Sequence, residues 1–405
     1  MRFVYKTFLT SAAFLIFLTS CSSKQHDKAI PPPNVVLKPL DTKALLAYDP
    51  KNADKRIDSF ILDLHRTRSF NGNVLVAKHG KIIYEKAIGW ADYLHRDSLK
   101  IGSQFELASV TKTMTSTAIL QLIERGKLNL NDDVKKFFPD FPYDGVTVRL
   151  LLTHRSGMMN YVYFTDDLYR AQHLDERKGI TNAEEMALIA KYKPTRFNKP
   201  DARFLYNNSN FMVLGSIIEK VTGQSYADYM KQNVFKPAGM EHTAVYSKAV
   251  FTKKIPVDVV GHDRGQWRYS VVQNFLDGPV GDKGVYSTIG DLYLFDRALR
   301  EGRLLKQSSM DSAYVPRNPI IHGHFSYGYG WRIFEAPGKQ VIYHTGWWHG
   351  FRHIFLRDIK DDITIVMLSN LSNGSLLKLD ELFKIAGMPV VRKSAYNGNG
   401  DTSDD

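Results

Sequence analysis

Cysteine is almost missing from this sequence, which has a single one, Cys21, among 405 residues. One cysteine excludes a disulfide scaffold and a zinc site built from several thiolates. Because Cys21 lies in an expected export segment, described next, it also leaves no thiol nucleophile for the folded part. Any covalent chemistry therefore falls to serine, threonine, lysine or a carboxylate side chain.

Apolar runs long enough to span a membrane are missing as well. The run from Phe8 to Leu18 is too short for a spanning helix, which needs ~18–20 residues. It follows a basic start and ends in Leu-Thr-Ser-Cys, which resembles a bacterial lipobox. We expect residues 1–20 to be a lipoprotein signal peptide and Cys21 to carry the lipid. The product would be an exported lipoprotein anchored in the cell envelope, at the outer membrane or the periplasmic face. A plain secretory signal with a coincidental cysteine is the alternative.

The composition shows no strong bias. Hydrophobic residues make up 43% and charged residues 24%, which disfavours disorder, collagen and coiled coil. The formal charge of +12 suits anionic envelope polymers or lipid surfaces better than nucleic acid, and surface solubility alone explains it better than either. Residues 21–50 hold three consecutive prolines and predict an extended tether. Residues 51–387 are the expected folded domain, and residues 388–405 the expected disordered tail.

Patterns of secondary structure change along this domain. Residues 57–64 have the apolar spacing of a helix, and residues 73–78 and 81–88 predict two strands joined at His79-Gly80. Helical patterns dominate residues 111–240, so we expect a helical lobe over roughly 111–260. Strand patterns return at 329–334, 340–345, 352–356 and 363–368, before a last helix over 376–386. One antiparallel sheet, with the helical middle packed beside it, is the simplest arrangement.

A serine and a lysine three residues apart, Ser109 and Lys112, stand where the helical region begins. Residues i and i+3 share a helix face, so the amine would lie beside the hydroxyl. A helix N-terminus also offers free backbone N–H groups that stabilise an oxyanion. The same spacing recurs at Ser375 and Lys378, and by itself it is better explained by a helix cap with a solvated lysine.

The surrounding sequence changes that balance. Four segments follow one another in order along the chain: Phe105 to Asp133, LLTHRSGM at 151–158, Tyr206-Asn207-Asn208 and His344-Thr345-Gly346. No comparable segments accompany Ser375. Over residues 55–387 the sequence resembles the serine hydrolase family of class C β-lactamases, D-alanyl-D-alanine carboxypeptidases of the penicillin-binding type, D-aminopeptidases and related esterases. The resemblance implies an α+β fold, with an antiparallel β-sheet flanked by helices plus an all-helical lobe.

The resemblance also implies roles for the motif residues. Ser109 would be the nucleophile that forms an acyl-enzyme. Lys112 would be the base, which requires a pKa depressed from ~10.4. Tyr206 is the rival base or proton relay, and the choice between the two stays open. Asn208 would orient Lys112 and donate a hydrogen bond to the substrate.

The third motif, His344-Thr345-Gly346, ends a predicted strand and would form one wall of the cleft, with Gly346 leaving room for substrate. The backbone N–H of Trp347 would complete an oxyanion hole with that of Ser109. Histidine replaces the lysine of many relatives, so we expect binding to depend on pH near neutrality and to favour substrates without a free carboxylate. The indoles of Trp347 and the next residue would narrow the cleft, or pack between the lobes. Residues 281–284 match a family loop for which we expect a structural role.

These features predict an envelope-anchored serine hydrolase that cleaves an amide, peptide, ester or lactam through an acyl-Ser109 intermediate. Its partners would be a small-molecule or peptide substrate and the lipid anchor, with no nucleic acid and no cofactor. Metal is not expected, because the histidine pairs at 322/324 and 349/353 have no acidic partner and lie on strand or turn. His154 should be structural. The alternative is a catalytically silent lipoprotein of the same fold that binds peptidoglycan or peptides. The oligomeric state is unknown from these patterns.

Overall fold

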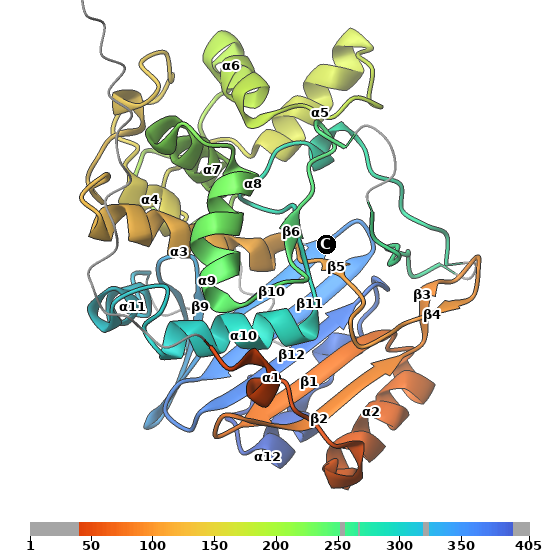
Figure 1. Ribbon diagram of the computed structural model, residues 1–405. Helices are drawn as coiled ribbons and strands as arrows, with labels where there is room; N and C mark the ends of the chain where they lie inside the picture. The colour runs from red at the N-terminus through yellow and green to blue at the C-terminus, as the bar shows by residue number, and fades with distance from the viewer. Residues whose placement is uncertain (1–39, 252–255, 266–267, 319–323, 392–405) are drawn as a thin grey trace, which may run out of the picture. The chain divides into compact units, whose positions relative to one another are not determined.

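The computed structural model describes residues 40–251, 256–265, 268–318 and 324–391 (Figure 1). The predicted signal peptide, Cys21 and residues 21–39 of the predicted tether lie outside this range. The rest of the tether is folded, since it contains helix α1 (Thr42–Leu45), and Leu45 and Leu46 pack against the main core. Met388 and Val391 are buried too, so residues 388–391 belong to the folded part rather than to the tail. Among the described helices, none is long and apolar enough to cross a membrane.

The α+β fold class is confirmed, with a large antiparallel sheet and many helices. The remaining helices of four residues or more are α2 (Lys55–Arg68), α3 (Thr111–Glu124), α4 (Val148–Leu152), α5 (Tyr161–Gln172), α6 (Asn182–Tyr192), α7 (Asn208–Thr222), α8 (Tyr226–Met230), α10 (Ile289–Arg300), α11 (Gln307–Ala313) and α12 (Asp380–Ala386). A π-helical segment, Lys231–Phe235, leads from α8 into the short α9 (Lys236–Ala238).

Seven strands form the main sheet in the order β2-β1-β12-β11-β10-β9-β8. Their bounds are β1 Gly72–Lys78, β2 Lys81–Ile88, β8 Phe325–Tyr327, β9 Arg332–Ala336, β10 Lys339–Trp348, β11 Phe351–Asp358 and β12 Ile363–Ser369. The early hairpin thus lies beside the last strand, with Gly72 opposite Ser369. A two-stranded sheet, β3 (Trp90–Asp92) and β4 (Asp97–Ser98), and a three-stranded one, β5 (Phe105–Glu106), β7 (Val285–Ser287) and β6 (Ala244–Val245), complete the strands of the described chain.

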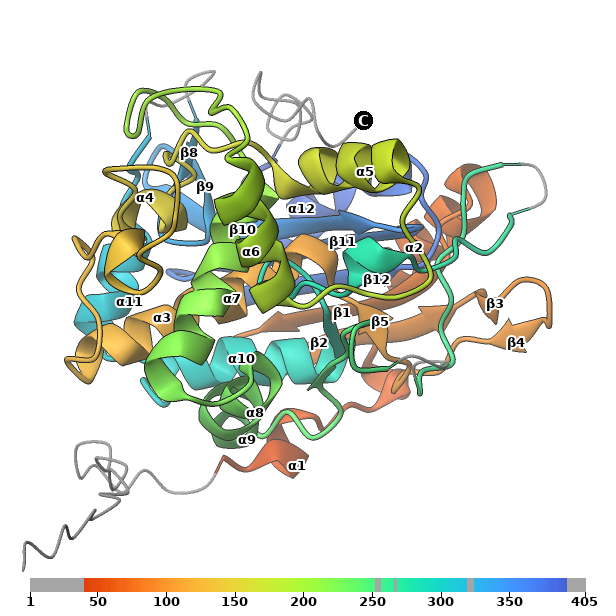
Figure 2. The ribbon, with the colours of Figure 1, turned by 90° about the horizontal axis from the view of Figure 1, so that it is seen from above.

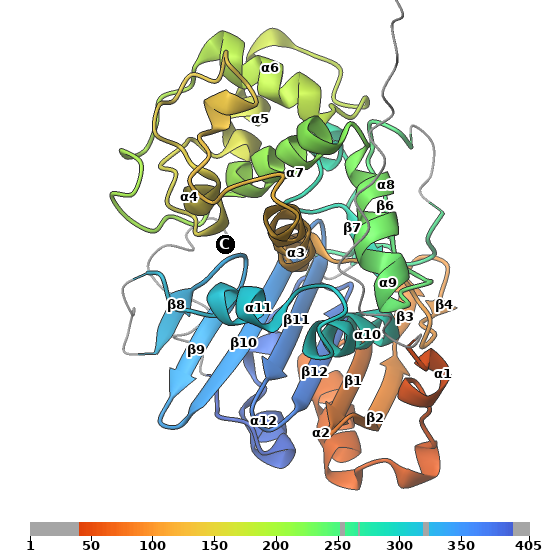
Figure 3. The same cartoon turned by 60° about the vertical axis from the view of Figure 1, so that its left-hand side comes forward.

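Both faces of the main sheet are covered, as Figures 2 and 3 show. On one face, Val74 and Val76 of β1 pack with side chains of α2 and α12. On the other, Leu75 belongs to the larger core that includes α3, α7 and α10. Side chains alternate along a strand, and burial on both faces explains why β1 reads as an unbroken apolar run.

Two predicted elements differ from the structure. The strand predicted at 329–334 begins only at Arg332, as β9, because the chain turns between β8 and β9, where Gly330 has φ +75°. The helix predicted at 376–386 is a 3-10 turn, Ser375–Leu377, followed by α12, and Gly387 with φ +82° ends it as expected. Leu376 and Leu379 are buried, as the apolar spacing predicted. The prediction of one continuous helix was wrong.

Candidate active site

Ser109 lies in a 3-10 turn, Ala108–Val110, that leads directly into α3. The turn packs against β10 at Gly346, where a Cβ would come within 2.4 Å of the carbonyl oxygen of Leu107. Ala108, immediately before the serine, is buried and has φ +48°, a left-handed conformation that is rare outside glycine. Backbone strain of this kind persists where the surrounding structure fixes it, and here it sets the position of Ser109.

Lys112 is one turn further along α3 and is fully buried. Its Nζ lies 2.8 Å from Ser109 Oγ, 2.8 Å from Asn208 Oδ1 and 3.0 Å from the backbone oxygen of Asp282. The amide oxygen and the carbonyl oxygen can only accept hydrogen bonds, so Lys112 donates to both. The predicted pairing of Ser109 with Lys112 and the predicted contact with Asn208 are therefore both present.

Asn208 reaches Lys112 because its neighbour takes over the capping of α7. Asn207 is the N-cap, and its Oδ1 accepts a hydrogen bond from the backbone N–H of Ser209 at 2.8 Å. The Asn207 side chain also donates to the carbonyl oxygen of Met158 at 2.7 Å. With the helix end satisfied in this way, the Asn208 side chain is available to the lysine.

Tyr206 is buried beside this group. Lys112 Nζ lies 5.1 Å from the centre of its ring, and the guanidinium carbon of Arg332 lies 4.9 Å from the same point. His154 packs against the ring with centroids 4.3 Å apart. The ring of Tyr206 is thus in contact with two basic side chains and one histidine.

His344 is fully buried and lies in a chain of hydrogen bonds. Nδ1 of His154 accepts from the backbone N–H of Asn207, so its Nε2 carries the proton and donates to Tyr327 Oη at 3.2 Å. Tyr327 then donates to His344 Nε2 at 3.0 Å, and His344 Nδ1–H donates to the carbonyl oxygen of Thr345 at 2.7 Å. With both imidazoles neutral, each of these hydrogen bonds has one donor and one acceptor.

Electrostatics agree with this assignment. Burial, followed by the charges of Arg332 and Lys112, holds the pKa of His344 well below its usual value. The prediction that substrate binding depends on the titration of His344 near neutral pH is therefore wrong, because desolvation keeps the ring neutral there. The expectation that Gly346 leaves room for substrate stays a prediction, and a Cβ at this position would meet the backbone of Leu107.

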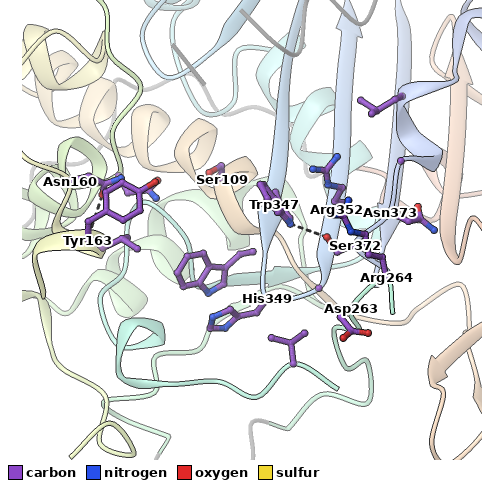
Figure 4. A pocket seen from close by; sticks show the side chains of 17 residues that line it. Ser109, Asn160, Tyr163, Asp263, Arg264, Trp347, His349, Arg352, Ser372 and Asn373 are labelled. Carbon is purple, nitrogen blue, oxygen red and sulfur yellow. Dashed lines mark hydrogen bonds between the residues drawn. The ribbon is translucent and has the colours of Figure 1, made fainter. Parts of the chain in front are cut away.

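A pocket of about 680 Å³ opens beside Ser109 (Figure 4). Of the predicted residues, Ser109, Asn208 and Trp347 line it, whereas Lys112, Tyr206, His344, Thr345 and Gly346 lie outside its lining. Trp347 donates from Nε1 to Ser372 Oγ at 3.0 Å, and Arg352 stacks over its ring at 4.7 Å. Figure 4 shows Ser109 and Tyr163 at one end and Arg352, Arg264 and Asn373 toward the other.

Trp348 points to the opposite face of β10 from Trp347. Its Nε1 donates to Asp277 Oδ1 at 2.6 Å, and its ring stacks on His349 with centroids 4.3 Å apart. Both indoles line the pocket, and Trp348 also packs against the main core.

The histidine spacings give no metal centre in the described part of the chain, where no three histidine, cysteine or acidic residues could hold an ion together. His349 Nδ1 lies 3.2 Å from Asp277 Oδ2, whereas His353 is buried and contacts the carbonyl oxygen of Glu106. His322 lies outside the described residues. The second Ser-x-x-Lys match, at Ser375, pairs a buried serine with an exposed Lys378.

The model of the Beta-lactamase family matches residues 58–384. This chain belongs to the Beta-lactamase family. Penicillin-binding protein 4* of Bacillus subtilis (strain 168) is 32% identical over 336 residues, which are 79% of this chain and 72% of the relative. Protein flp of Staphylococcus aureus (strain MRSA252) is 28% identical over 346 residues, 82% of this chain and 65% of the relative.

Solved structures agree with this Beta-lactamase assignment. A penicillin binding protein from Bacillus halodurans superposes with a TM-score of 0.69 at 25% identity, covering 81% of this chain and 98% of that one. The D-amino acid amidase from Ochrobactrum anthropi SV3 shares the fold, with a TM-score of 0.66 at 23% identity over 79% of this chain and 91% of that one. As a member of the Beta-lactamase family, the chain is a serine hydrolase.

Three features of this Beta-lactamase site are not visible in the motifs. The Asp282 carbonyl contributes a backbone atom, for which no residue type is required. Tyr327 and Arg332 approach the site from β8 and β9, and their distance along the chain from Ser109 gives no spacing signal. The glycines around Tyr327 were the available hint, since a Cβ on Gly330 would come within 2.5 Å of Ser116 Cβ on α3.

Proposed function

We propose that this protein is an envelope-anchored hydrolase that cleaves an amide, peptide, ester or lactam bond through an acyl-Ser109 intermediate. The observation that carries the proposal is the placement of Lys112 Nζ 2.8 Å from Ser109 Oγ while Asn208 and Asp282 hold the amine. In the neutral amine, the two held oxygens take both N–H bonds and leave the lone pair for the serine proton.

Acylation follows from that geometry. Lys112 removes the proton from Ser109 Oγ, which attacks the substrate carbonyl carbon, and the carbonyl oxygen takes up negative charge. The backbone N–H groups of Ser109 and Trp347 stabilise this oxyanion. Collapse of the intermediate breaks the bond to the leaving group, which receives a proton from the group formed by Lys112 and Tyr206. Water then attacks the acyl-enzyme, and the same group returns the proton to Ser109.

Amide and peptide substrates are the favoured class. One neighbour in fold is named a D-amino acid amidase, and two relatives are named penicillin-binding proteins. The neutral His344 supplies no cation for a substrate carboxylate. Arg352 and Arg264 line the pocket wall and could contact such a carboxylate.

Envelope anchoring is proposed from the sequence around Cys21, which is the sole cysteine and ends a short apolar run. The Cys21→Ser protein, expressed in a bacterium with lipoprotein processing, should lose its lipid and leave the membrane fraction. Wild type is the matched control. Retention of the variant in membranes would instead indicate an uncleaved signal anchor.

The reaction is tested by intact mass of wild type and Ser109→Ala after exposure to a penicillin and to an activated acetyl ester. We expect a Ser109-dependent adduct or turnover, with unchanged thermal unfolding of the variant. A lasting penicillin adduct points to a carboxypeptidase-like enzyme, rapid penicillin loss to a lactamase, and ester turnover alone to an esterase or amidase. No adduct and no turnover with either compound would favour the silent binding protein.

A further inference from the structure

The loop between residues 280 and 284, for which the sequence predicted only a structural role, is held by its surroundings at almost every backbone group. Asn182 bonds both the N–H and the carbonyl oxygen of Val280, at 2.7 and 3.1 Å. Thr115 donates to the carbonyl oxygen of Gly281 at 2.6 Å. Gly281 has φ +107°, and a Cβ there would come within 2.5 Å of the carbonyl oxygen of Phe211. The loop is thus fixed between α3, α6 and α7, with the Asp282 carbonyl facing Lys112.

Two charged side chains in this loop form a buried pair, and one of them belongs to the residue whose carbonyl contacts Lys112. Lys283 Nζ lies 3.3 Å from Asp282 Oδ2, with side chains 4% and 1% exposed. Tyr161 of α5 bridges them, because its hydroxyl donates to Asp282 Oδ2 at 3.1 Å and accepts from Lys283. The ammonium also lies 4.8 Å from the ring of Trp348 in the pocket wall. Asp282 Oδ1 is buried and has no hydrogen-bond partner among the described residues.

We propose that Lys283 and Asp282 are positioning residues whose opposed charges tune the proton affinity of Lys112, through the carbonyl that Asp282 presents to its amine. This inference rests on the proposed function of Ser109 and Lys112. A buried ion pair is a costly way to hold a loop that glycines and hydrogen bonds already fix. Placed beside a base, the same pair gives two charges of opposite sign that act on one proton.

Other ionisable groups surround both partners. The charge of Lys283 lowers the pKa values of Glu106 of β5, Glu185 of α6 and Asp277. For the two glutamates burial is the larger effect, and it raises the pKa of each to about 8. Those two carboxyls are therefore largely protonated at pH 7, which leaves Asp282 and Asp277 as the carboxylates near the ammonium. Lys112 contacts Ser109 and Asn208 in addition to the loop carbonyl, and the ring of Tyr206 lies 5.1 Å from its Nζ. Its charge lowers the pKa values of His154 and His344, and Arg332 lies over the same Tyr206 ring.

The two partners have opposite expected effects, which separates tuning from mere support. Lys283→Met removes the ammonium and leaves the carboxylate, so Lys112 should hold its proton to higher pH. Asp282→Asn removes the carboxylate and leaves the ammonium, so Lys112 should release its proton at lower pH. Each shift should be about one pH unit, the lower end for a charge close to a titrating group.

The experiment measures kcat/KM for p-nitrophenyl acetate from pH 5 to 10 with the full chain. In Lys283→Met the acid limb of the pH profile should move up by about one unit, with about tenfold lower kcat at pH 7 and KM within twofold. In Asp282→Asn the acid limb should move down. The double variant should lie near wild type. Lys283→Gln, which keeps a donor for Tyr161, replaces Lys283→Met if that variant does not fold. Lys339→Met, which breaks the partly exposed ion pair of Lys339 with Asp361 at the start of β10, is the matched control.

A second readout does not need turnover. The titration midpoint of Lys112, followed by 13C NMR of lysine Cε and assigned with Lys112→Arg, should move in the same two directions. Shifts in one direction for both variants, or no shift beyond that of Lys339→Met, would overturn the inference and leave the pair a structural support. Opposite NMR shifts in a protein that hydrolyses no ester would instead uphold the inference while contradicting the proposed function.

Discussion

The phenol oxygen of Tyr327 lies 3.0 Å from Nε2 of His344 and so occupies the ring nitrogen that would otherwise face a ligand. The other ring nitrogen donates to the carbonyl oxygen of Thr345. In this Beta-lactamase-family chain, the histidine of the third motif is therefore part of the wall that supports Tyr206, with which it packs at 6.2 Å between centroids.

His344 should remain neutral across the pH range in which histidine usually titrates. Burial and the charge of Arg332 depress its pKa, so protonation should begin only well below pH 6.5. Long-range 1H–15N NMR of the imidazole nitrogens should show the Nδ1–H tautomer from pH 8 down to 5.5. A midpoint between pH 6 and 7 would contradict the buried hydrogen-bond chain.

Stability should fall on the acid side partly because of His353, whose pKa burial lowers to about 4. The unfolded chain binds a proton near pH 6.5 and the folded chain does not, so this contribution is present above pH 6.5 and is lost toward pH 4. The loss amounts to about 1.4 kcal/mol per pH unit, or about 3 kcal/mol over the window. Urea unfolding of wild type and His353→Gln at pH 7 and 5 measures it.

The variant should show the shallower pH dependence, whatever its stability at pH 7. His242→Gln, at an exposed histidine, is the control and should follow wild type. Equal slopes for all three proteins would mean that the pKa of His353 is the same in the folded and unfolded chains.

Loss of either candidate base should reduce turnover strongly. Lys112→Met and Tyr206→Phe are each expected to lower kcat/KM for an activated ester by about 10²–10⁴-fold, the usual contribution of general acid–base catalysis. Full activity in one of them would assign the proton transfer to the other residue. Lys378→Met, in the second Ser-x-x-Lys match, should keep wild-type rates because that lysine is exposed.

Backbone strain at the residue before the nucleophile should lower the free energy of unfolding. Ala108 has φ +48°, which glycine adopts without steric cost, so Ala108→Gly should raise the free energy of unfolding by about 0.5–1 kcal/mol. The same substitution inside α3, Ala118→Gly, should lower it by about 1 kcal/mol or more. Chemical denaturation of both variants decides the matter, and destabilisation of similar size in both would remove strain as the reason for the conformation of Ala108.

The sequence was most informative where a pattern is local. The hairpin at His79-Gly80, the strands after residue 339 and the Ser109–Lys112 pair all follow from short-range spacing, and the structure has each of them. Asn208 was predicted beside Lys112 from the family resemblance, and the distance of 2.8 Å agrees.

The limits of the sequence predictions share a physical origin. His344 was expected to titrate because sequence gives the residue type and not its burial. Gly346 was expected to admit substrate, and the sequence could not say that the backbone of Leu107 lies against it. The contact of Lys283 with Tyr161 joins residues that are 122 positions apart, which no periodicity encodes.

Pairing of β1 with β12 also determines when this chain can fold. These two neighbouring strands come from opposite ends of the domain, with Asn73 opposite Leu368, so β1 and β2 cannot join the rest of the sheet until β12 has been synthesised. Closing so long a loop makes such topologies slow to form. Until then, the edge of β1 that pairs with β12 is open. A chain threaded through a membrane N-terminus first would therefore still be unfolded at this part of the sheet. Late pairing of β12 with β1 is thus compatible with export in an extended state. The sheet is complete only once this pairing has formed.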